Sequence, residues 1–150
     1  MLTALLHFED FEPGQKLVLD NRYTVMAEEI AEFARAYDPQ PHHLDDEFAR
    51  TTVLGGIAAS GWHVCAIAMR LIAEEVLTRA ACAGGASVEE CRWLKPVRPG
   101  DTLRVEIEIL ETRVPRSRAD IGFVKMRWDV FNQDGRVAAI TTTPMFQRRT

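Results

Sequence analysis

The sequence predicts an α+β fold in which a five-stranded antiparallel sheet wraps around a central buried helix. The helix is indicated by residues 57–69, which contain no Asp, Glu, Lys or Arg. A helix that is apolar all round is a buried one, and this stretch is too short to span a membrane. We therefore expect its first half to be covered on every side. The sheet is indicated by residues 102–109 and 124–130, where apolar and polar side chains alternate as in half-buried strands.

The other elements are predicted in order along the chain. Residues 16–25 are expected to form the first strand, residues 27–36 a short amphipathic helix, and residues 46–50 a helical turn. Residues 87–95 supply a further strand, and the last strand, residues 136–147, follows an Asp-Gly pair typical of a hairpin turn. Such a sheet leaves an edge strand open, which pairing with a second copy would cover. We therefore expect a homodimer or a dimer of dimers.

Length and charge narrow the classes of partner. The chain has 150 residues, which fit a single domain over residues 1–150. Its net charge of −4 and pI near 5.6 argue against nucleic acid, because domains that bind a phosphate backbone are normally basic. No stretch approaches the ~20 apolar residues of a membrane span, so no membrane partner is expected.

The N-terminus and the cysteines suggest a compartment. Residues 1–6 have no basic flank and are soon followed by acidic residues, unlike a secretory signal or a transit peptide. The three cysteines, Cys65, Cys82 and Cys91, form no CxxC pair. We expect them to be reduced, buried thiols in a cytoplasmic protein.

A carboxylate and an imidazole stand five residues apart, at Asp38 and His43. Helical periodicity is lost across residues 37–56, and Pro39 and Pro41 favour an extended path there. On such a stiffened loop the two side chains can converge on one small site. The pair suits general acid–base catalysis on water, because an imidazole titrates near neutrality and a carboxylate can orient it or share its protons.

Small residues dominate residues 55–61, where the buried helix begins. Glycine lets a ligand approach the backbone closely. Free N–H groups at a helix N-terminus, together with the helix dipole, stabilise developing negative charge. The segment therefore has what an oxyanion hole for a thioester enolate requires.

These two segments together resemble the MaoC-like dehydratase and (R)-specific enoyl-CoA hydratase family. The family signature is an Asp-x-Asn-Pro-x-His loop, followed by His-x-Asp-x-x-Phe-Ala and then Ile-x-His-Gly-Met. Asp38, Pro41 and His43 keep the spacing of the first element, and Gly61 falls in register with the oxyanion glycine of the last. The resemblance covers most of the chain and implies a hotdog fold.

The resemblance implies syn addition of water to a trans-2-enoyl-CoA, or the reverse dehydration. Asp38 and His43 would hold and polarise the water, with His43 taking its proton and Asp38 managing the proton at the α-carbon. The Gly61 N–H would bind the thioester oxygen. The implied substrate is an acyl-CoA thioester, and no separate cofactor is expected because coenzyme A is part of the substrate.

The resemblance also implies a set of substrate contacts: Gln40, Pro41, Gly56, Ile57, Ser60 and Trp62. Three positions depart from the family pattern. Gln40 replaces the loop asparagine, Ser60 replaces the histidine before the glycine, and Met69 stands where a serine is sometimes found. These changes leave the acid–base pair intact and indicate an altered wall of the acyl pocket.

Two further features have more than one interpretation. His42, His43 and His63 suggest a metal, but adjacent histidines point apart in an extended chain and no zinc-type spacing is present. No metal site is therefore expected. The arginines of residues 113–118 suit the phosphates of coenzyme A, or they form a solvated turn.

Two other functions compete with hydration. A hotdog thioesterase typically needs a carboxylate on or near the central helix, and residues 57–69 contain none. A non-catalytic module that binds acyl-CoA or dimerises usually loses the acid–base pair first, whereas Asp38 and His43 are both present. Fold alone does not decide among these activities. Hydration is the prediction, and the other two are its alternatives.

Overall fold

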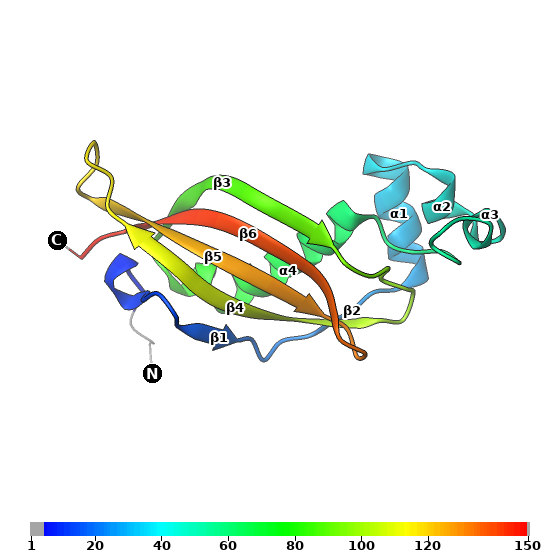
Figure 1. The fold of residues 1–150 in the computed structure, drawn as a ribbon, viewed down its shortest axis with the longest axis horizontal. Helices are drawn as coiled ribbons and strands as arrows, with labels where there is room; N and C mark the ends of the chain where they lie inside the picture. The colour runs from blue at the N-terminus through cyan, green and yellow to red at the C-terminus, as the bar shows by residue number, and fades with distance from the viewer. Residues whose placement is uncertain (1–4, 150) are drawn as a thin grey trace.

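The structure is a computed structural model that describes residues 5–149, and its centre is one sheet of six strands. Four of these strands are long: β3 (Cys82–Trp93), β4 (Thr102–Arg113), β5 (Ile121–Phe131) and β6 (Arg136–Gln147). The order is β1-β4-β5-β6-β3, and every pairing between strands is antiparallel. Strand β3 is therefore an outer edge of the sheet (Figure 1).

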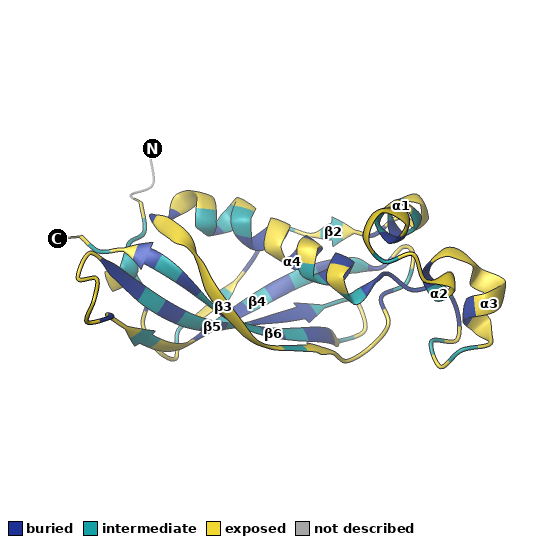
Figure 2. Ribbon diagram, turned by 90° about the horizontal axis from the view of Figure 1, so that it is seen from above, coloured by how far each residue is buried: buried dark blue, intermediate teal, exposed yellow. Residues whose placement is uncertain are grey.

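Helix α4 (Gly61–Glu75) lies along one face of this sheet (Figures 1 and 2). One stripe of the helix joins the buried core, through Val64, Ile67, Ala68, Leu71 and Ile72. The predicted burial on every side is wrong, because Trp62, Ala66 and Met69 are exposed on another stripe. The uncharged stretch thus combines a core-facing stripe with an apolar stripe that this chain does not cover by itself.

The predicted first strand is two short strands, β1 (Lys16–Val18) and β2 (Tyr23–Thr24), so the sheet has six strands rather than five. Both pair with β4. Between them the backbone leaves the sheet, because the N–H groups of Asp20 and Asn21 donate to the carboxylate of Glu75 instead.

The three α-helices that precede α4 gather beyond one end of the sheet (Figure 1). Helices α1 (Ala27–Tyr37) and α3 (Asp46–Arg50) lie where the sequence predicts them. A further short helix, α2 (Pro41–Leu44), occupies part of the predicted extended loop. Its first residue is a proline, whose fixed φ and missing N–H suit that position. The backbone is extended at Gln40, as predicted, and at Asp45, the residues that flank α2, but Asp38 lies outside the extended region.

The three cysteines are free thiols in two different settings. Cys65 on α4 and Cys91 on β3 are half-buried, with their Sγ atoms 3.6 Å apart. Burial, together with the neighbouring Cys91 thiol, raises the pKa of Cys65 to about 12. Cys82 is exposed, so the prediction of a buried thiol is wrong there, because this residue begins the outermost strand.

Two short 3-10 helices complete the described elements, η1 (Phe8–Asp10) and η2 (Leu77–Arg79). The first lies at the end of the sheet away from α2 (Figure 1), and the second directly follows α4. Within residues 5–149, no helix has both the length and the hydropathy needed to cross a bilayer.

Candidate active site

Three segments converge near the N-terminal end of α4. Asp38 directly follows α1, His43 lies in α2, and Ser60 immediately precedes Gly61, the first residue of α4. Helix α2 turns the His43 ring back toward the end of α1. As a result, His43 Nε2 lies 3.1 Å from Asp38 Oδ2, within hydrogen-bonding reach.

The Asp38 carboxylate accepts hydrogen bonds on both oxygens. Gln40 Nε2 donates to Oδ1 at 2.6 Å, and Ser60 Oγ donates to Oδ2 at 2.7 Å. Burial raises the pKa of Asp38, but these hydrogen bonds and the charge that His43 can carry outweigh burial and hold the pKa below its usual range. Asp38 is therefore ionised at neutral pH.

His43 has one ring nitrogen fixed by the backbone and one that faces the carboxylate. Its side chain is 8% exposed, and Nδ1 lies 2.7 Å from the carbonyl oxygen of Ala58. A carbonyl oxygen only accepts, so Nδ1 carries a proton and donates it. Nε2 is then the atom that can accept a proton from water or exchange one with Asp38.

The start of α4 presents N–H groups that no side chain caps. Ser60 occupies the N-cap position, where a serine hydroxyl normally accepts a hydrogen bond from its own helix. Here the hydroxyl donates to Asp38 instead, and within the described chain no side chain caps α4. The first turn also carries no acidic residue. The helix dipole and the N–H groups from Gly61 onward are therefore available to an anionic oxygen.

An apolar cavity of about 240 Å³ adjoins these groups. His43 and Gly61 form part of its wall, and Lys95 contributes a cation. The apolar part of the lining comes from Leu54, Ala59, Val64, Leu94, Val97 and Val137. A mainly apolar wall with a few convergent polar groups is typical of a site for a small organic ligand.

Three of the predicted substrate-contact residues lie at the Asp38–His43 pair. Gln40 and Ser60 each donate a hydrogen bond to Asp38, and Pro41 begins the helix that carries His43. All three therefore help to shape the pair. A direct contact between these residues and a substrate stays a prediction.

Gly56, Ile57 and Trp62 lie apart from the pair. The carbonyl oxygens of Gly56 and Ile57 accept hydrogen bonds from the Arg98 guanidinium at 2.8 and 3.1 Å, and both residues line a separate surface hollow. Trp62 is 62% exposed and lines a third hollow along α4. The structure does not bring these residues to the Asp38 carboxylate, and their contact with substrate also stays a prediction.

The expectation that His42 and His43 point apart is wrong. Both lie in α2, and their ring centroids are 4.2 Å apart, because the backbone is helical there rather than extended. Across residues 5–149, no three side chains of His, Cys, Asp or Glu are grouped as metal ligands would be.

Two residues that contact the site were not among the predicted site residues. Trp93 donates its indole Nε1–H to the carbonyl of Gly61 at 2.9 Å, across 32 residues of sequence. Arg98 donates to three carbonyls of one loop, those of Leu54, Gly56 and Ile57, and so anchors the segment that leads into α4. Both contacts join segments that are more than 30 residues apart in sequence, so residue spacing does not predict the contacts themselves.

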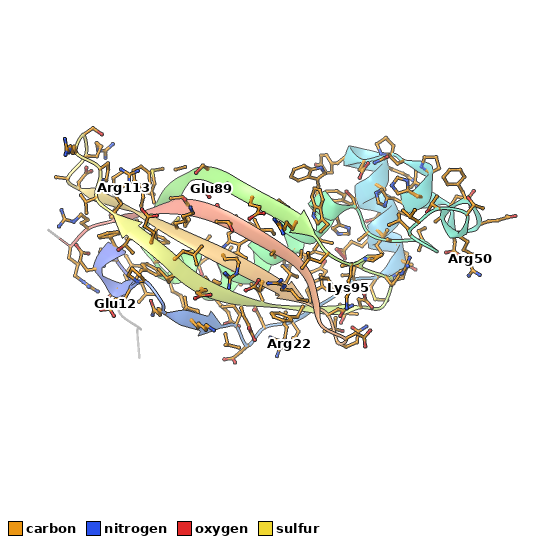
Figure 3. The ribbon with its side chains drawn as sticks, viewed as in Figure 1. Glu12, Arg22, Arg50, Glu89, Lys95 and Arg113 are labelled. Carbon is orange, nitrogen blue, oxygen red and sulfur yellow. The ribbon has the colours of Figure 1, made fainter. Side chains whose placement is uncertain are left out.

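The arginine-rich turn lies far from the pair within one chain. Figure 3 shows Arg113 at one end of the molecule and Lys95 and Arg50 toward the other. Arg118 forms an ion pair with Asp120 at 2.6 Å, and both side chains are exposed. In the single chain, Arg113, Arg116 and Arg118 are therefore exposed to solvent around the buried Pro115.

The chain is similar to known proteins along most of its length. A family model described as "MaoC like domain" matches residues 9–124. The chain is 31% identical over 128 residues to the uncharacterized protein YdeM of Bacillus subtilis, and this alignment covers 85% of this chain and 89% of that protein. It is 30% identical over 117 residues to the 3-hydroxybutyryl-CoA dehydratase of Methylorubrum extorquens, and this alignment covers 77% of this chain and 71% of that enzyme.

A solved structure matches almost the whole chain. The crystal structure of the MaoC-like dehydratase from Rhodospirillum rubrum superposes with a TM-score of 0.89 at 41% identity, covering 97% of this chain and 99% of that one. The predicted hotdog fold is thereby confirmed, with a sixth strand added.

Proposed function

The chain belongs to the MaoC-like domain family, and on this premise we propose that it hydrates a 2-enoyl-CoA to a 3-hydroxyacyl-CoA, or catalyses the reverse dehydration. The observation that carries the proposal is the Asp38–His43 pair, 3.1 Å apart, beside the uncapped start of α4. Such a pair can move the protons of a water molecule, and the helix start can stabilise a thioester oxygen as it gains charge. A CoA thioester is also the substrate named for the 3-hydroxybutyryl-CoA dehydratase relative.

In the hydration direction, the water lies beside the pair, within reach of both the Asp38 carboxylate and His43 Nε2. Nε2 takes one proton as the water oxygen bonds to the β-carbon, and the π electrons move to the thioester carbonyl to give an enolate. The Gly61 N–H donates to the enolate oxygen. The proton passes from Nε2 across 3.1 Å to Asp38 Oδ2 and then to the α-carbon as the carbonyl forms again. One water has been added, and both side chains have returned to their starting states.

The stereochemistry follows from this arrangement. The water oxygen and the returning proton both reach the substrate from the side occupied by Asp38 and His43, so the addition is syn. The low pKa of Asp38 keeps its carboxylate ionised while it orients the water. The hydrogen bond from Nδ1 to Ala58 keeps Nε2 directed at the same point.

The test is hydration of crotonyl-CoA, followed by the loss of the enoyl absorbance, in Asp38→Asn and His43→Ala. Each variant is expected to lower kcat by about 10² or more, because each removes one of the two proton-transfer groups. Asp134→Asn and His7→Ala make the same two types of substitution away from the site and serve as matched controls. Wild-type rates in both site variants would refute the mechanism.

A thioesterase is the second candidate, and the structure supplies little to support it. Helix α4 carries no acidic side chain before Glu74 near its C-terminal end, so it offers no second carboxylate beside Gly61. A thioesterase releases free thiol and leaves the enoyl group unchanged. Assaying thiol release alongside enoyl absorbance separates the two reactions, and thiol release alone would favour the thioesterase. A protein that binds acyl-CoA and catalyses neither reaction would be the non-catalytic module.

We further propose a homodimer formed through β3. This strand is the edge of the sheet, is 12 residues long, and is exposed at every position except the half-buried Cys91 (Figure 2). An open edge of this length is normally covered, and two-fold antiparallel pairing of two β3 strands would cover both at once. The pairing would also turn the arginine-rich turn of one copy toward the site of the other. Sedimentation over a range of concentrations tests this, and a monomer throughout would refute it.

A further inference from the structure

Trp93 closes one side of the apolar cavity beside His43. It is the last residue of β3, and it lines the cavity together with Gly61 of α4. Its indole Nε1–H donates to the Gly61 carbonyl at 2.9 Å. The ring packs so closely on this glycine that a Cβ there would lie 2.7 Å from Nε1. Trp62 packs edge-on against the same ring, with the centroids 5.2 Å apart. One hydrogen bond and two packing contacts therefore hold the ring in one orientation.

A second and larger hollow lies along α4 and β3, and Trp62, which packs against the Trp93 ring, forms part of its wall. Its volume is about 480 Å³, and its wall is mostly apolar. The lining comes from α4, β3, β5 and β6, and the first cavity shares α4, β3 and β6 with it. On α4, Cys65 follows Val64, and on β3, Cys91 stands two residues before Trp93. Trp93 lines the small cavity, which contains the reactive groups, and its neighbour Trp62 lines the larger hollow, which contains none of them.

We propose that Trp93 limits the length of the acyl chain that the site accepts, so that short acyl groups enter and longer ones are excluded. This inference rests on the proposed hydratase function, which places the thioester at Gly61 and the reacting carbons at Asp38 and His43. From there the acyl chain occupies the 240 Å³ cavity, which is smaller than the ~300–1,000 Å³ typical of sites for drug-sized ligands. Additional carbons along this path meet the indole ring.

Removing the ring would join the two spaces. The apolar wall of the larger hollow would then bury further methylene groups, each of which contributes to affinity. Trp93 acts here by contact with the acyl group and takes no part in the proton transfers. The change expected is therefore in the choice between substrates.

The experiment compares trans-2-octenoyl-CoA with crotonyl-CoA, as a ratio of kcat/KM values, in the wild type, Trp93→Ala and Trp93→Phe. Octenoyl-CoA carries four more methylenes than crotonyl-CoA, and burying even two of them corresponds to about a tenfold gain, so Trp93→Ala is expected to raise the ratio by about tenfold or more. Trp93→Phe keeps most of the ring and is expected to stay within about threefold of the wild type. Arg92→Ala changes the neighbouring, exposed residue of the same strand and is the control for effects on β3 itself.

A binding measurement separates this inference from the proposed function. Octanoyl-CoA and butyryl-CoA have no enoyl group to hydrate, so the ratio of their Kd values reports the pocket without turnover. A wild type that hydrates neither enoyl-CoA would refute the proposed function, and the binding ratio would still decide the role of Trp93. Hydration of crotonyl-CoA by the wild type, with both ratios unchanged in Trp93→Ala, would overturn the inference alone. A wild type that already prefers the longer chain would also overturn it.

Discussion

Ser60→Ala tests whether the hydroxyl at the start of α4 stabilises the Asp38 carboxylate. Ser60 is fully buried, and its Oγ lies 2.7 Å from Asp38 Oδ2. A hydrogen bond to a charged group contributes about 1.5–3 kcal/mol, so the variant should lose about that much free energy of unfolding. The measurement is urea denaturation of the wild type and the variant at pH 7.

A double-mutant cycle assigns this loss to the pair. In an Asp38→Ala background the carboxylate is absent, and the serine hydroxyl can at most turn to cap α4. Ser60→Ala should then cost about 1 kcal/mol or less. An equal cost in both backgrounds would refute the reasoning, because it would mean that Ser60 stabilises something other than Asp38.

The pH dependence supplies a second check with a defined sign. The pKa of Asp38 is lowered in the folded protein, so the stability it contributes is present above the unfolded pKa of about 4 and is lost as the pH falls through the folded value. The difference between the wild type and Ser60→Ala should therefore be full at pH 7 and shrink below about pH 4. A difference that is constant over this range would contradict an ionised partner.

Three further predictions concern the rest of the site. Gly61→Ala places a Cβ against the Trp93 ring, so the rate of crotonyl-CoA hydration should fall by about 10² or more. Partial recovery in the double variant with Trp93→Ala would show that the clash is the cause, and no recovery would argue against it. Gln40→Leu removes the donor to Asp38 Oδ1 and should raise the pKa of Asp38, which moves the acid limb of the kcat/KM profile to higher pH; an unmoved limb would contradict that contact. Arg98→Ala removes the donor to three carbonyls of the loop before α4 and should lower the free energy of unfolding by about 2–4 kcal/mol, with partial rescue by Arg98→Lys. Full stability in the alanine variant would show that the loop does not need this anchor.

Regular elements could be predicted from the sequence where one face alone meets the core. The strand around residues 102–109 is an example, because its alternation matches the buried-exposed pattern observed along β4. The short N-terminal strand could not be predicted in this way. Its break depends on the Glu75 carboxylate, which lies more than 50 residues away in sequence and takes the N–H groups of Asp20 and Asn21.

The exposed stripe of α4 shows a second limit. The lack of charged residues in a helix predicts that its side chains are covered, but it does not show whether the same chain covers them. Trp62 and Met69 are exposed within one chain, although their residue types are those of a core. The apolar pattern therefore predicted the position of the helix, but which of its faces is buried depends on how it packs against the sheet.

The same division holds at the candidate site. Sequence by itself determined that a carboxylate and an imidazole stand on one short segment, Asp38 and His43, and that small residues precede a helix start at Gly61. These are local properties, set by residue type and spacing along a few residues of chain. Only the tertiary structure decided that the Ser60 hydroxyl serves Asp38 instead of its own helix, and that the Trp93 indole covers Gly61. The physical reason is that both contacts join segments 22 and 32 residues apart, so they exist only once the sheet has brought these segments together.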